Sequence, residues 1–170
     1  MPHRRAVVAA WACLCVLALA GCSHYGFSPS VPGGPRSVAV PVLRNETLEY
    51  GVDQGVTDAI VAALTENSSM RIVPEAEAEA VVRGRVTVYE RPVLSYDAAG
   101  NPREYRVRVT AALSYEDRRS GTVIWDGTVE GWGVYAVSGD AGTATTEEEA
   151  RAEAFERLAA DLVSKTVQGW

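Results

Sequence analysis

Histidine and cysteine are almost missing from this 170-residue chain, and the few that occur all lie before residue 25. From Tyr25 to Trp170 there is neither an imidazole nor a thiol. That region therefore lacks the ligand set of a zinc site, a thiol nucleophile and the base of a Ser-His-Asp triad. It also cannot form a disulfide, even in an oxidising compartment. The sequence predicts neither an enzyme nor a bound metal or cofactor.

An excess of basic charge and a long apolar run are also missing. The formal net charge is −6, so the overall balance does not favour nucleic acid as a partner. The longest apolar run, Ala6–Ala20, has roughly 15 residues, whereas a membrane-spanning helix needs about 20. What is present is typical of one globular domain, with 47% hydrophobic and 22% charged residues.

The short apolar run follows Met1–Arg5, which carries two arginines and no acid, and this order is typical of a secretory signal. The run ends in Leu19-Ala20-Gly21-Cys22, which resembles the lipobox of bacterial lipoproteins. The resemblance implies that the Cys22 thiol receives a diacylglycerol, that the signal is cut before Cys22, and that the new amino terminus is acylated. Three acyl chains anchor a protein firmly, whereas a single chain binds a membrane only marginally.

The predicted cleavage divides the chain into three parts. Residues 1–21 are the signal peptide, 22–35 a lipidated tether rich in Ser, Pro and Gly, and 36–170 a single α+β domain. Removing Arg4 and Arg5 lowers the basic count from 16 to 14 against 22 acidic residues, so the net charge becomes −8. In lipoproteins, serine after the modified cysteine implies the outer membrane, and Ser23 stands there.

Apolar periodicity predicts the elements of the first half of the domain. Arg36–Leu43 is rich in valine and predicts a strand buried on both faces or nearly so. Residues 52–66 have apolar side chains at steps of four, which indicates a helix. "MRIVP" predicts a short strand, and the acidic "EAEAEA" at 75–80 fits either a short helix or a solvated loop.

From Val81 the period changes to two, which predicts three antiparallel strands joined by turns at 97–102 and 118–121. The first strand is interrupted near Pro92, and Gly131-Trp132-Gly133 predicts a bend or a bulge in the third. Arginines, acids and threonines occupy the alternate, solvent-facing positions. The predicted core-facing side chains are Val82, Val86, Val88, Leu94 and Tyr96, then Tyr105, Val107, Val109, Ala111, Leu113 and Tyr115, then Val123, Trp125 and Val129.

A second helix closes the chain. Thr146 and Glu149 have the spacing of a capping box, and the three glutamates at 147–149 suit the positive end of a helix dipole. The element order is strand-helix-strand-strand-strand-helix, with single apolar stripes on the helices. We therefore predict an α+β two-layer sandwich, with both helices on one face of a mainly antiparallel four-stranded sheet. The predicted buried stripe of the last helix is Phe155, Leu158, Ala159, Leu162 and Thr166.

The mature sequence resembles the LPS-assembly lipoprotein family, LptE. The resemblance lies in "GCSHYGFS", "VAVPVLRNETLEYGVDQGVTDAIVAAL", "RVTVYERPVLSYDAAGNPREYRVRVTAALSYEDRRSGTVIWDG" and "YAVSGD…TEEEARAEAFERLAADL", in that order. It implies a non-enzymatic outer-membrane lipoprotein on the periplasmic side. Such a protein plugs a large β-barrel partner of the LptD type and helps the barrel to assemble. The resemblance also implies contact with lipopolysaccharide.

A second class remains open, an envelope or secretion lipoprotein of the curli-pore or Tol type that forms a homo-oligomer or scaffold. "VAVPVLRNETL…VTDAIVAALTENSSMRIV" resembles the opening of those domains too. The "REYRV" strand is not part of that resemblance, and the chain has no residues left over for amphipathic membrane hairpins. A periplasmic hydrolase has no support beyond the acidic runs.

The candidate contact residues are basic or aromatic side chains at solvent-facing strand positions. One interpretation is a wet sheet face with cross-strand ion pairs, Arg108 with Glu130 and Arg83 with Glu116. The other is a surface for the barrel wall or for lipid A phosphates, which arginine binds through its bidentate fork. The candidates are Arg83, Arg85, Arg106, Arg108 and Trp132.

Loop order adds Arg103 to these candidates. In an antiparallel meander, alternate connections lie at the same end, so the turn at 97–103 and the loop at 137–145 should be neighbours. The resemblance implies lipopolysaccharide contact by basic residues near such loops. Arg103 fits that role, but the second loop has no basic residue.

Overall fold

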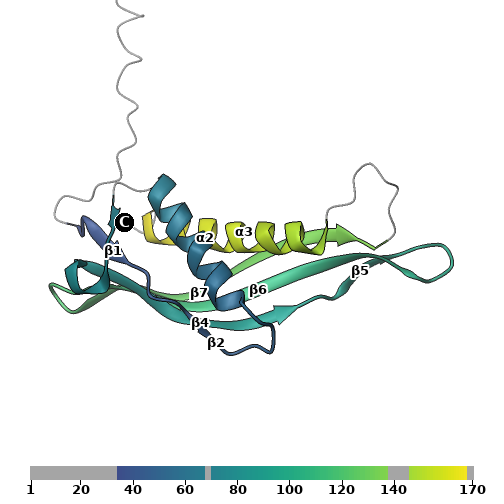
Figure 1. Ribbon diagram of the computed structural model, residues 1–170, viewed down its shortest axis with the longest axis horizontal. Coiled ribbons are helices and arrows are strands. Elements are labelled where there is room, and N and C mark those ends of the chain that lie inside the picture. The colour runs from purple at the N-terminus through teal and green to yellow at the C-terminus, as the bar shows by residue number, and fades with distance from the viewer. Residues whose placement is uncertain (1–33, 68–69, 138–145, 168–170) are drawn as a thin grey trace, which may run out of the picture.

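The computed structural model describes residues 34–67, 70–137 and 146–167 (Figure 1). The predicted signal peptide, Cys22, nearly all of the tether and most of the 137–145 loop lie outside these ranges. In chain order the elements are β1 Ser37–Ala39, β2 Arg44–Asn45, α2 Val52–Asn67, β3 Arg71–Ile72, a 3-10 turn at Glu75–Glu77, β4 Ala80–Glu90, β5 Val93–Tyr96, β6 Pro102–Asp117, β7 Thr122–Ala136 and α3 Glu147–Val167.

The sheet is mixed and has seven strands, so the prediction of a mainly antiparallel four-stranded sheet was wrong. Antiparallel pairing joins β4 to β6, β6 to β7 and β5 to β6, while β1 and β2 run parallel to β4 and β3 runs parallel to β1. The strand expected at 36–43 is divided into β1 and β2. Pro41 lies between them and has no N–H for a ladder, and the Leu43 N–H donates instead to the Thr57 hydroxyl of α2 (3.1 Å).

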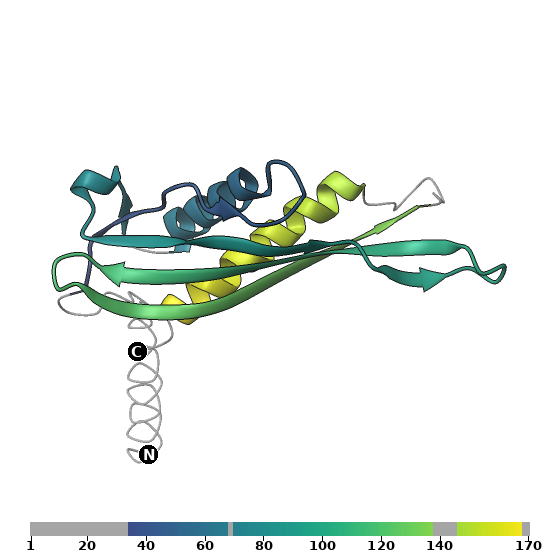
Figure 2. The same cartoon turned by 90° about the horizontal axis from the view of Figure 1, so that it is seen from below.

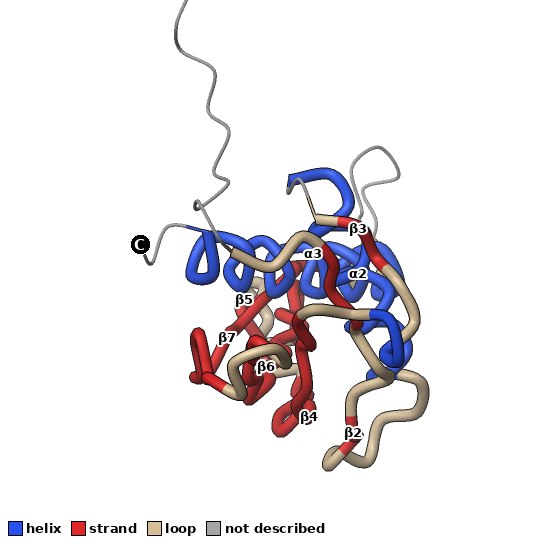
Figure 3. Tube along the Cα trace, turned by 90° about the vertical axis from the view of Figure 1, so that its left-hand side faces the viewer, coloured by secondary structure: helices blue, strands red, loops and turns tan. Residues whose placement is uncertain are grey.

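Both helices cover the same face of the sheet, which curves around them (Figures 1 and 3). The stripe of α2 and the predicted stripe of α3 are buried in one apolar core with the inward side chains of β4, β6 and β7. The capping box is also confirmed: the Glu149 N–H donates to the Thr146 hydroxyl (3.1 Å), and the Thr146 N–H donates to the Glu149 carboxylate (2.7 Å).

Two bulges change which side chains face the core. Thr87 is skipped in the pairing of β4 with β6, and Ile124 is skipped in the pairing of β6 with β7. Beyond Thr87 the alternation is reversed, so Tyr89 packs against the core and Val88 lies on the opposite face, contrary to the prediction. The bulge at Ile124 likewise leaves Val123 exposed opposite Glu116.

Beyond the helices, β5 and the facing part of β6 form an arm (Figure 2). Neither of the two described helices, α2 and α3, covers this end of the sheet (Figures 1 and 2). Leu94 and Tyr96, predicted to face the core, are therefore 42% and 62% exposed. The predicted alternation also does not hold in β5, because Val93 rather than Leu94 pairs with Tyr105 of β6 and the register shifts on both sides of Ser95.

The expected bulge at Gly131-Trp132-Gly133 does not occur, because Gly131 and Gly133 pair regularly with Val109 and Val107. These glycines instead let α3 approach β7. A Cβ on Gly131 would lie 1.9 Å from the Ala154 carbonyl oxygen, and one on Gly133 would lie 2.0 Å from the Ala150 carbonyl oxygen. The helix backbone therefore rests directly on the strand at two points.

Among the described residues β7 pairs with β6 alone, so its second edge is open. The Val137 N–H donates to the Arg103 oxygen (3.0 Å), which makes odd-numbered residues the hydrogen-bonded ones and turns the even-numbered carbonyls outward. Two basic side chains of α3 cover this edge. Arg157 Nη1 donates to the Trp132 oxygen (2.9 Å), and Lys165 Nζ donates to the Thr128 oxygen (3.0 Å).

Removing both basic side chains should therefore expose the edge. We expect Arg157→Ala combined with Lys165→Ala to increase self-association of the purified chain, because uncovered edge carbonyls are a template for another strand. Light scattering coupled to size exclusion measures it. The control removes their helical partners instead, Glu153→Ala with Asp161→Ala, and keeps the carbonyl contacts. If both double variants have the same mass as the parent, the two contacts do not protect the edge.

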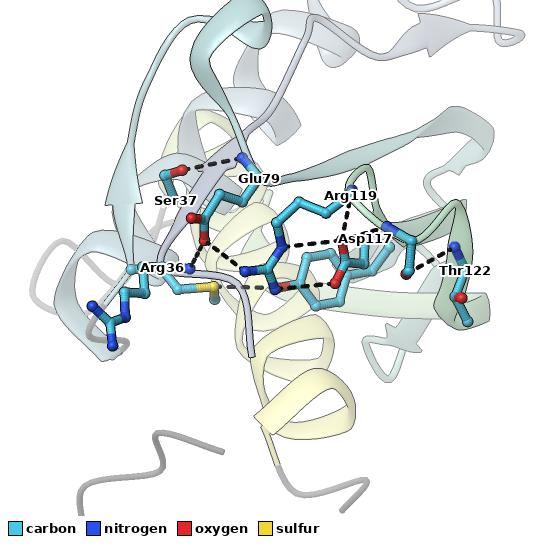
Figure 4. A network of polar contacts seen from close by, with 9 residues as sticks. Arg36, Ser37, Glu79, Asp117, Arg119 and Thr122 are labelled. Atoms are coloured by element: carbon cyan, nitrogen blue, oxygen red, sulfur yellow. Dashed lines mark hydrogen bonds and ion pairs between the residues drawn. The ribbon is translucent and has the colours of Figure 1, made fainter. Parts of the chain in front are cut away.

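A polar network fixes the start of the domain to the β6–β7 turn (Figure 4). The Arg36 N–H donates to Glu79 Oε2 (2.6 Å), the Glu79 N–H donates to the Ser37 hydroxyl (3.1 Å), and Arg119 lies 3.7 Å from Glu79. Hydrogen bonding from the Arg119 side chain lowers the pKa of Asp117. The start of the domain, directly after the predicted tether, is thus held against the turn between β6 and β7.

Tyr115 is buried beneath this network, and its hydroxyl donates to Met70 Sδ (3.2 Å). Burial, with a smaller contribution from Asp117, raises the pKa of Tyr115 to about 12.

This raised pKa predicts a loss of stability in alkali. The folded-state pKa of Tyr115 exceeds the ordinary value of 10. The contribution of its neutral hydroxyl to the free energy of unfolding is therefore complete below pH 10 and disappears as pH rises towards 12. We expect the wild type to lose up to about 2 kcal/mol more than Tyr115→Phe between pH 8 and 11.5 in urea unfolding. Equal losses for the two proteins would contradict the assignment.

Candidate interaction surface

Five of the six candidate contact residues lie together on the sheet face that points away from the helices, which we call the outer face. In the register, Glu90, Arg108 and Trp132 are neighbours across three strands, and Arg85 lies opposite Ala112. Alternation places Arg83 and Arg106 on the same face. The period-two pattern therefore identified this group correctly, because the bulge at Thr87 comes after Arg83 and Arg85.

Three of these arginines are paired with acids. Arg83 lies 3.6 Å from Glu116 and also contacts Glu75, Arg85 lies 3.1 Å from Glu46, and Arg108 Nε donates to Glu90 (2.7 Å). Arg108 also lies 3.8 Å from Glu130. Both predicted ion pairs are confirmed, although Arg108 faces Trp132 directly and Glu130 lies two residues further along β7, opposite Thr110.

Arg106 differs from the other three. It has no ion pair with the described residues, and its Nε atom is buried without a hydrogen-bond partner there. Its guanidinium lies 5.2 Å from the centre of the Trp132 ring, and Arg157 of α3 lies 3.7 Å from it. Trp132 thus contacts two guanidinium groups while remaining 41% exposed. This cluster combines uncompensated positive charge with an aromatic surface, which suits an anionic or partly apolar contact.

Arg103 lies apart from the outer-face group. It is exposed on the arm, and strand alternation places it on the face of Tyr105 rather than that of Arg106. Its backbone oxygen accepts from the Val137 N–H (3.0 Å), so the β5–β6 turn and the start of the next loop do share one end. Leu94, Tyr96 and Val137 are exposed at this same end.

The structure also reveals a surface that the sequence analysis missed. The segment Asn45–Tyr50, for which the sequence analysis predicted no contact residue, presents Leu48 and Tyr50 to solvent at 107% and 95% exposure. A groove of about 620 Å³ lies between this segment and β4, lined by residues 46–49 and 87–91. The only sign of this surface in the sequence is the pair of apolar residues, Leu48 and Tyr50, in an otherwise polar segment. The segment has no hydrophobic periodicity from which its exposed side chains could be predicted.

Tyr89 lines this groove and packs against the core. Its ring lies 5.6 Å from the Arg151 guanidinium and 5.8 Å from that of Arg91. Its hydroxyl is buried and has no hydrogen-bond partner among the described residues, and burial raises its pKa. Glu49 binds Arg151 (3.3 Å) and lies 3.8 Å from Arg91, and Arg91 also pairs with Glu147, so two glutamates balance the two arginines.

Within residues 34–67, 70–137 and 146–167, no group of three or more His, Cys, Asp or Glu side chains is arranged to hold a metal ion. The same ranges contain no helix that is both long enough and apolar enough to cross a membrane. The features of interest in the described residues are thus surfaces for contact, namely the outer face, the arm and the groove.

Comparison with known proteins identifies a family. The model of the lipopolysaccharide-assembly family, LptE, matches residues 35–166. No curated protein matches the chain.

Solved structures share the fold at low identity. A minor lipoprotein from Acinetobacter baumannii is 15% identical, with a TM-score of 0.51 over 79% of this chain and 94% of that one. A hypothetical protein from Chlamydia trachomatis is 9% identical, with a TM-score of 0.55 over 79% and 96%. The PelC dodecamer from Paraburkholderia phytofirmans is 18% identical, with a TM-score of 0.50 over 78% and 87%.

Proposed function

Because this chain belongs to the lipopolysaccharide-assembly family LptE, we propose that it is the plug of a β-barrel translocon that inserts lipopolysaccharide into the outer leaflet. Membership makes it an envelope lipoprotein of the lipopolysaccharide-assembly type, in a family that is not enzymatic and associates with LptD-like barrels. The family match over residues 35–166 carries this proposal, since it spans nearly the whole domain.

The proposed anchor is Cys22, acylated in the outer membrane so that the domain at 36–170 lies on the periplasmic side. The tether at 22–35 then joins the domain at Arg36, beside the network of Glu79 and Arg119. In this arrangement the membrane attachment is at the end of the sheet opposite the arm, which Figure 1 shows projecting beyond α3.

The proposed barrel contact is the outer face. Arg83, Arg85 and Arg108 are neutralised by glutamates, which suits them to a polar barrel wall. Arg106 with Trp132 is the better candidate for an anionic group, because no described acid neutralises it. Arg103 on the arm is a second, separate candidate for lipopolysaccharide contact, by the charge-assisted hydrogen bonds that arginine makes to phosphate.

The test is to isolate the lipidated chain from native outer membrane in mild detergent. The proposal expects a large outer-membrane β-barrel to co-purify with it in stoichiometric amount. Depletion of the chain should then lower both the level of that barrel and the amount of surface lipopolysaccharide. Elution of the lipoprotein alone, with surface lipopolysaccharide unchanged on depletion, contradicts the plug role.

The second candidate is a homo-oligomeric envelope lipoprotein. It is favoured by one observation, the similarity of the fold to the dodecameric PelC, at 18% identity. The same purification distinguishes the two, because a ring of identical chains without a barrel supports this candidate and a single copy bound to a barrel supports the plug.

A further inference from the structure

Among the four candidate arginines of the outer face, Arg106 alone has no acid partner in the described residues. Its Nε atom is buried there without a hydrogen-bond partner, and the side chain as a whole is half-buried. Partial burial withdraws the guanidinium from water, and a charge that is withdrawn from water without a counter-ion is unfavourable. The isolated domain therefore lacks an acid that this cation requires.

The accessible end of the Arg106 side chain is its pair of Nη atoms. Because Nε is covered by the protein, an incoming acceptor reaches the guanidinium at the Nη end. The two Nη atoms present parallel N–H donors, which match the two oxygens of one carboxylate. A single carboxylate can thus neutralise the charge without any rearrangement of the strand.

Trp132 forms a fixed wall beside this guanidinium. Its ring centre lies 5.2 Å from Arg106, and 41% of the side chain is exposed. Arg157 lies 3.7 Å from the same ring, but its Nη1 donates to the Trp132 oxygen (2.9 Å) and its Nη2 to Glu153 (2.5 Å). Arg157 therefore holds the ring and is itself neutralised. A partner that covers the ring excludes water from Arg106 as well, and this strengthens an ion pair made there.

The charges around Arg106 determine which anion fits. Glu104 lies two residues away on the same strand face, and Glu90 and Glu130 both lie at the neighbouring Arg108. A phosphate monoester carries about −1.5 to −2 charges, and one free arginine among these acids does not compensate them. A carboxylate carries a single negative charge, which one arginine balances. The surroundings therefore favour an acidic side chain over a phosphate.

We propose that Arg106 forms an ion pair with an aspartate or glutamate of the barrel wall, beside the ring of Trp132. This rests on the proposed function, because it names the contact by which the outer face holds the barrel. The pair becomes buried when the barrel covers Trp132, and it fixes the position of the sheet against the wall.

The first experiment measures how fast the lipoprotein leaves its barrel after the complex is isolated from native outer membrane and diluted. Arg106→Gln leaves the barrel carboxylate unpaired at a covered site, so we expect dissociation at least tenfold faster. The matched control is Arg71→Gln, because Arg71 is exposed on β3, which is not part of the outer-face group. This control should dissociate at the wild-type rate. An Arg106→Gln complex with the wild-type rate overturns the proposal.

Thermal unfolding of the isolated lipoprotein separates binding from folding. Arg106 makes no ion pair within the described residues, and its Nε has no acceptor there, so Arg106→Gln should leave the unfolding midpoint nearly unchanged. A midpoint that falls together with the lifetime of the complex would show that Arg106 acts through the fold, and this result also overturns the proposal.

Photo-crosslinking identifies the acid in a chain that retains Arg106. With p-benzoylphenylalanine at Trp132 of the full lipidated chain, the crosslinked barrel segment should contain an aspartate or glutamate. Replacing that acid by arginine should then restore the wild-type dissociation rate to an Arg106→Glu lipoprotein, whose complex alone dissociates faster.

Two results contradict the identity of the partner group. One is a crosslinked segment without an acid. The other is an Arg106→Glu complex that keeps its wild-type lifetime but retains less lipopolysaccharide, which would assign Arg106 to a lipid phosphate. If no barrel co-purifies with the wild type, it is the plug function itself that fails.

Discussion

Gly131→Ala should destabilise the domain by about 3 kcal/mol. The new Cβ would lie 1.9 Å from the Ala154 carbonyl oxygen and 2.6 Å from the Leu158 nitrogen, both of them backbone atoms of α3. Backbone cannot rotate away as a side chain can, so the helix must move off the strand. Overpacking of this kind typically costs 1–3 kcal/mol, and here the displaced unit is a 21-residue helix.

The measurement is thermal unfolding, in which a loss of this size lowers the midpoint by roughly 10 °C in a domain of this length. Gly127→Ala on the same strand is the matched control, because its Cβ would meet only the ring edge of Trp125, at 2.9 Å, which can shift. The control should lose less than about 1 kcal/mol. Equal midpoints for the two variants would show that α3 does not rest on β7 as described.

Gly133→Ala tests the same contact one turn earlier on α3, where the new Cβ would lie 2.0 Å from the Ala150 oxygen. Both substitutions would push the same helix away from β7, so their losses of stability should not add. Once the first substitution has raised α3, the second meets less resistance. The double variant is expected to lose clearly less than the sum of the single losses.

Cys22→Ala should abolish lipid attachment completely. Alanine has no nucleophile to receive a diacylglycerol, and the cleavage proposed before residue 22 depends on that modification. The intact mass of the isolated protein measures both events. We expect the wild type to begin at Cys22 with three acyl chains, and the variant to retain residues 1–21 with no acyl mass.

Cys15→Ala is the matched control for this experiment. Cys15 lies inside the apolar run that the proposed cleavage removes, so this variant should give the wild-type mass. A Cys22→Ala protein that still carries acyl chains, or a Cys15→Ala protein that loses them, would show that the lipobox resemblance has identified the wrong residue.

Local patterns predicted the helices well, because a helix satisfies its own backbone. The step-of-four stripe located α2, and the Thr146–Glu149 capping box gave the first turn of α3. The sequence also contains a signal for the close approach of α3 to β7, namely the two glycines, Gly131 and Gly133, at core-facing strand positions. We interpreted them as a bulge, since glycine marks both a bulge and a close approach.

Sheet pairing was harder to predict because it is decided between distant segments. The bulges at Thr87 and Ile124 depend on how β4 and β7 meet β6, and both residues are β-branched, as is usual in regular strands. One extra residue reverses the alternation, which is why Val88 and Val123 were assigned to the wrong face. Similarly, no local sequence pattern indicates that β1 and β2 run parallel to β4.

The outer face was predictable where the alternation was undisturbed. Arg106, Arg108 and Trp132 lie in a stretch of β6 and β7 with regular register, and both expected ion pairs formed. The conformation of the segment Asn45–Tyr50 was not predictable, because it is fixed by hydrogen bonds from Asn45 and from Arg151, which lies 101 residues away from Tyr50 in the chain.

The contact of Lys165 with the Thr128 oxygen has a practical consequence for chemical labelling. Lys165 is the only lysine in the sequence. If the amino terminus is acylated as proposed, the Lys165 Nζ is the one primary amine of the mature protein. An amine-reactive reagent would then modify a single site that is occupied by a strand-edge carbonyl. The labelling rate would report, without any engineered probe, how often the Lys165 amine is released from the Thr128 oxygen and from Asp161.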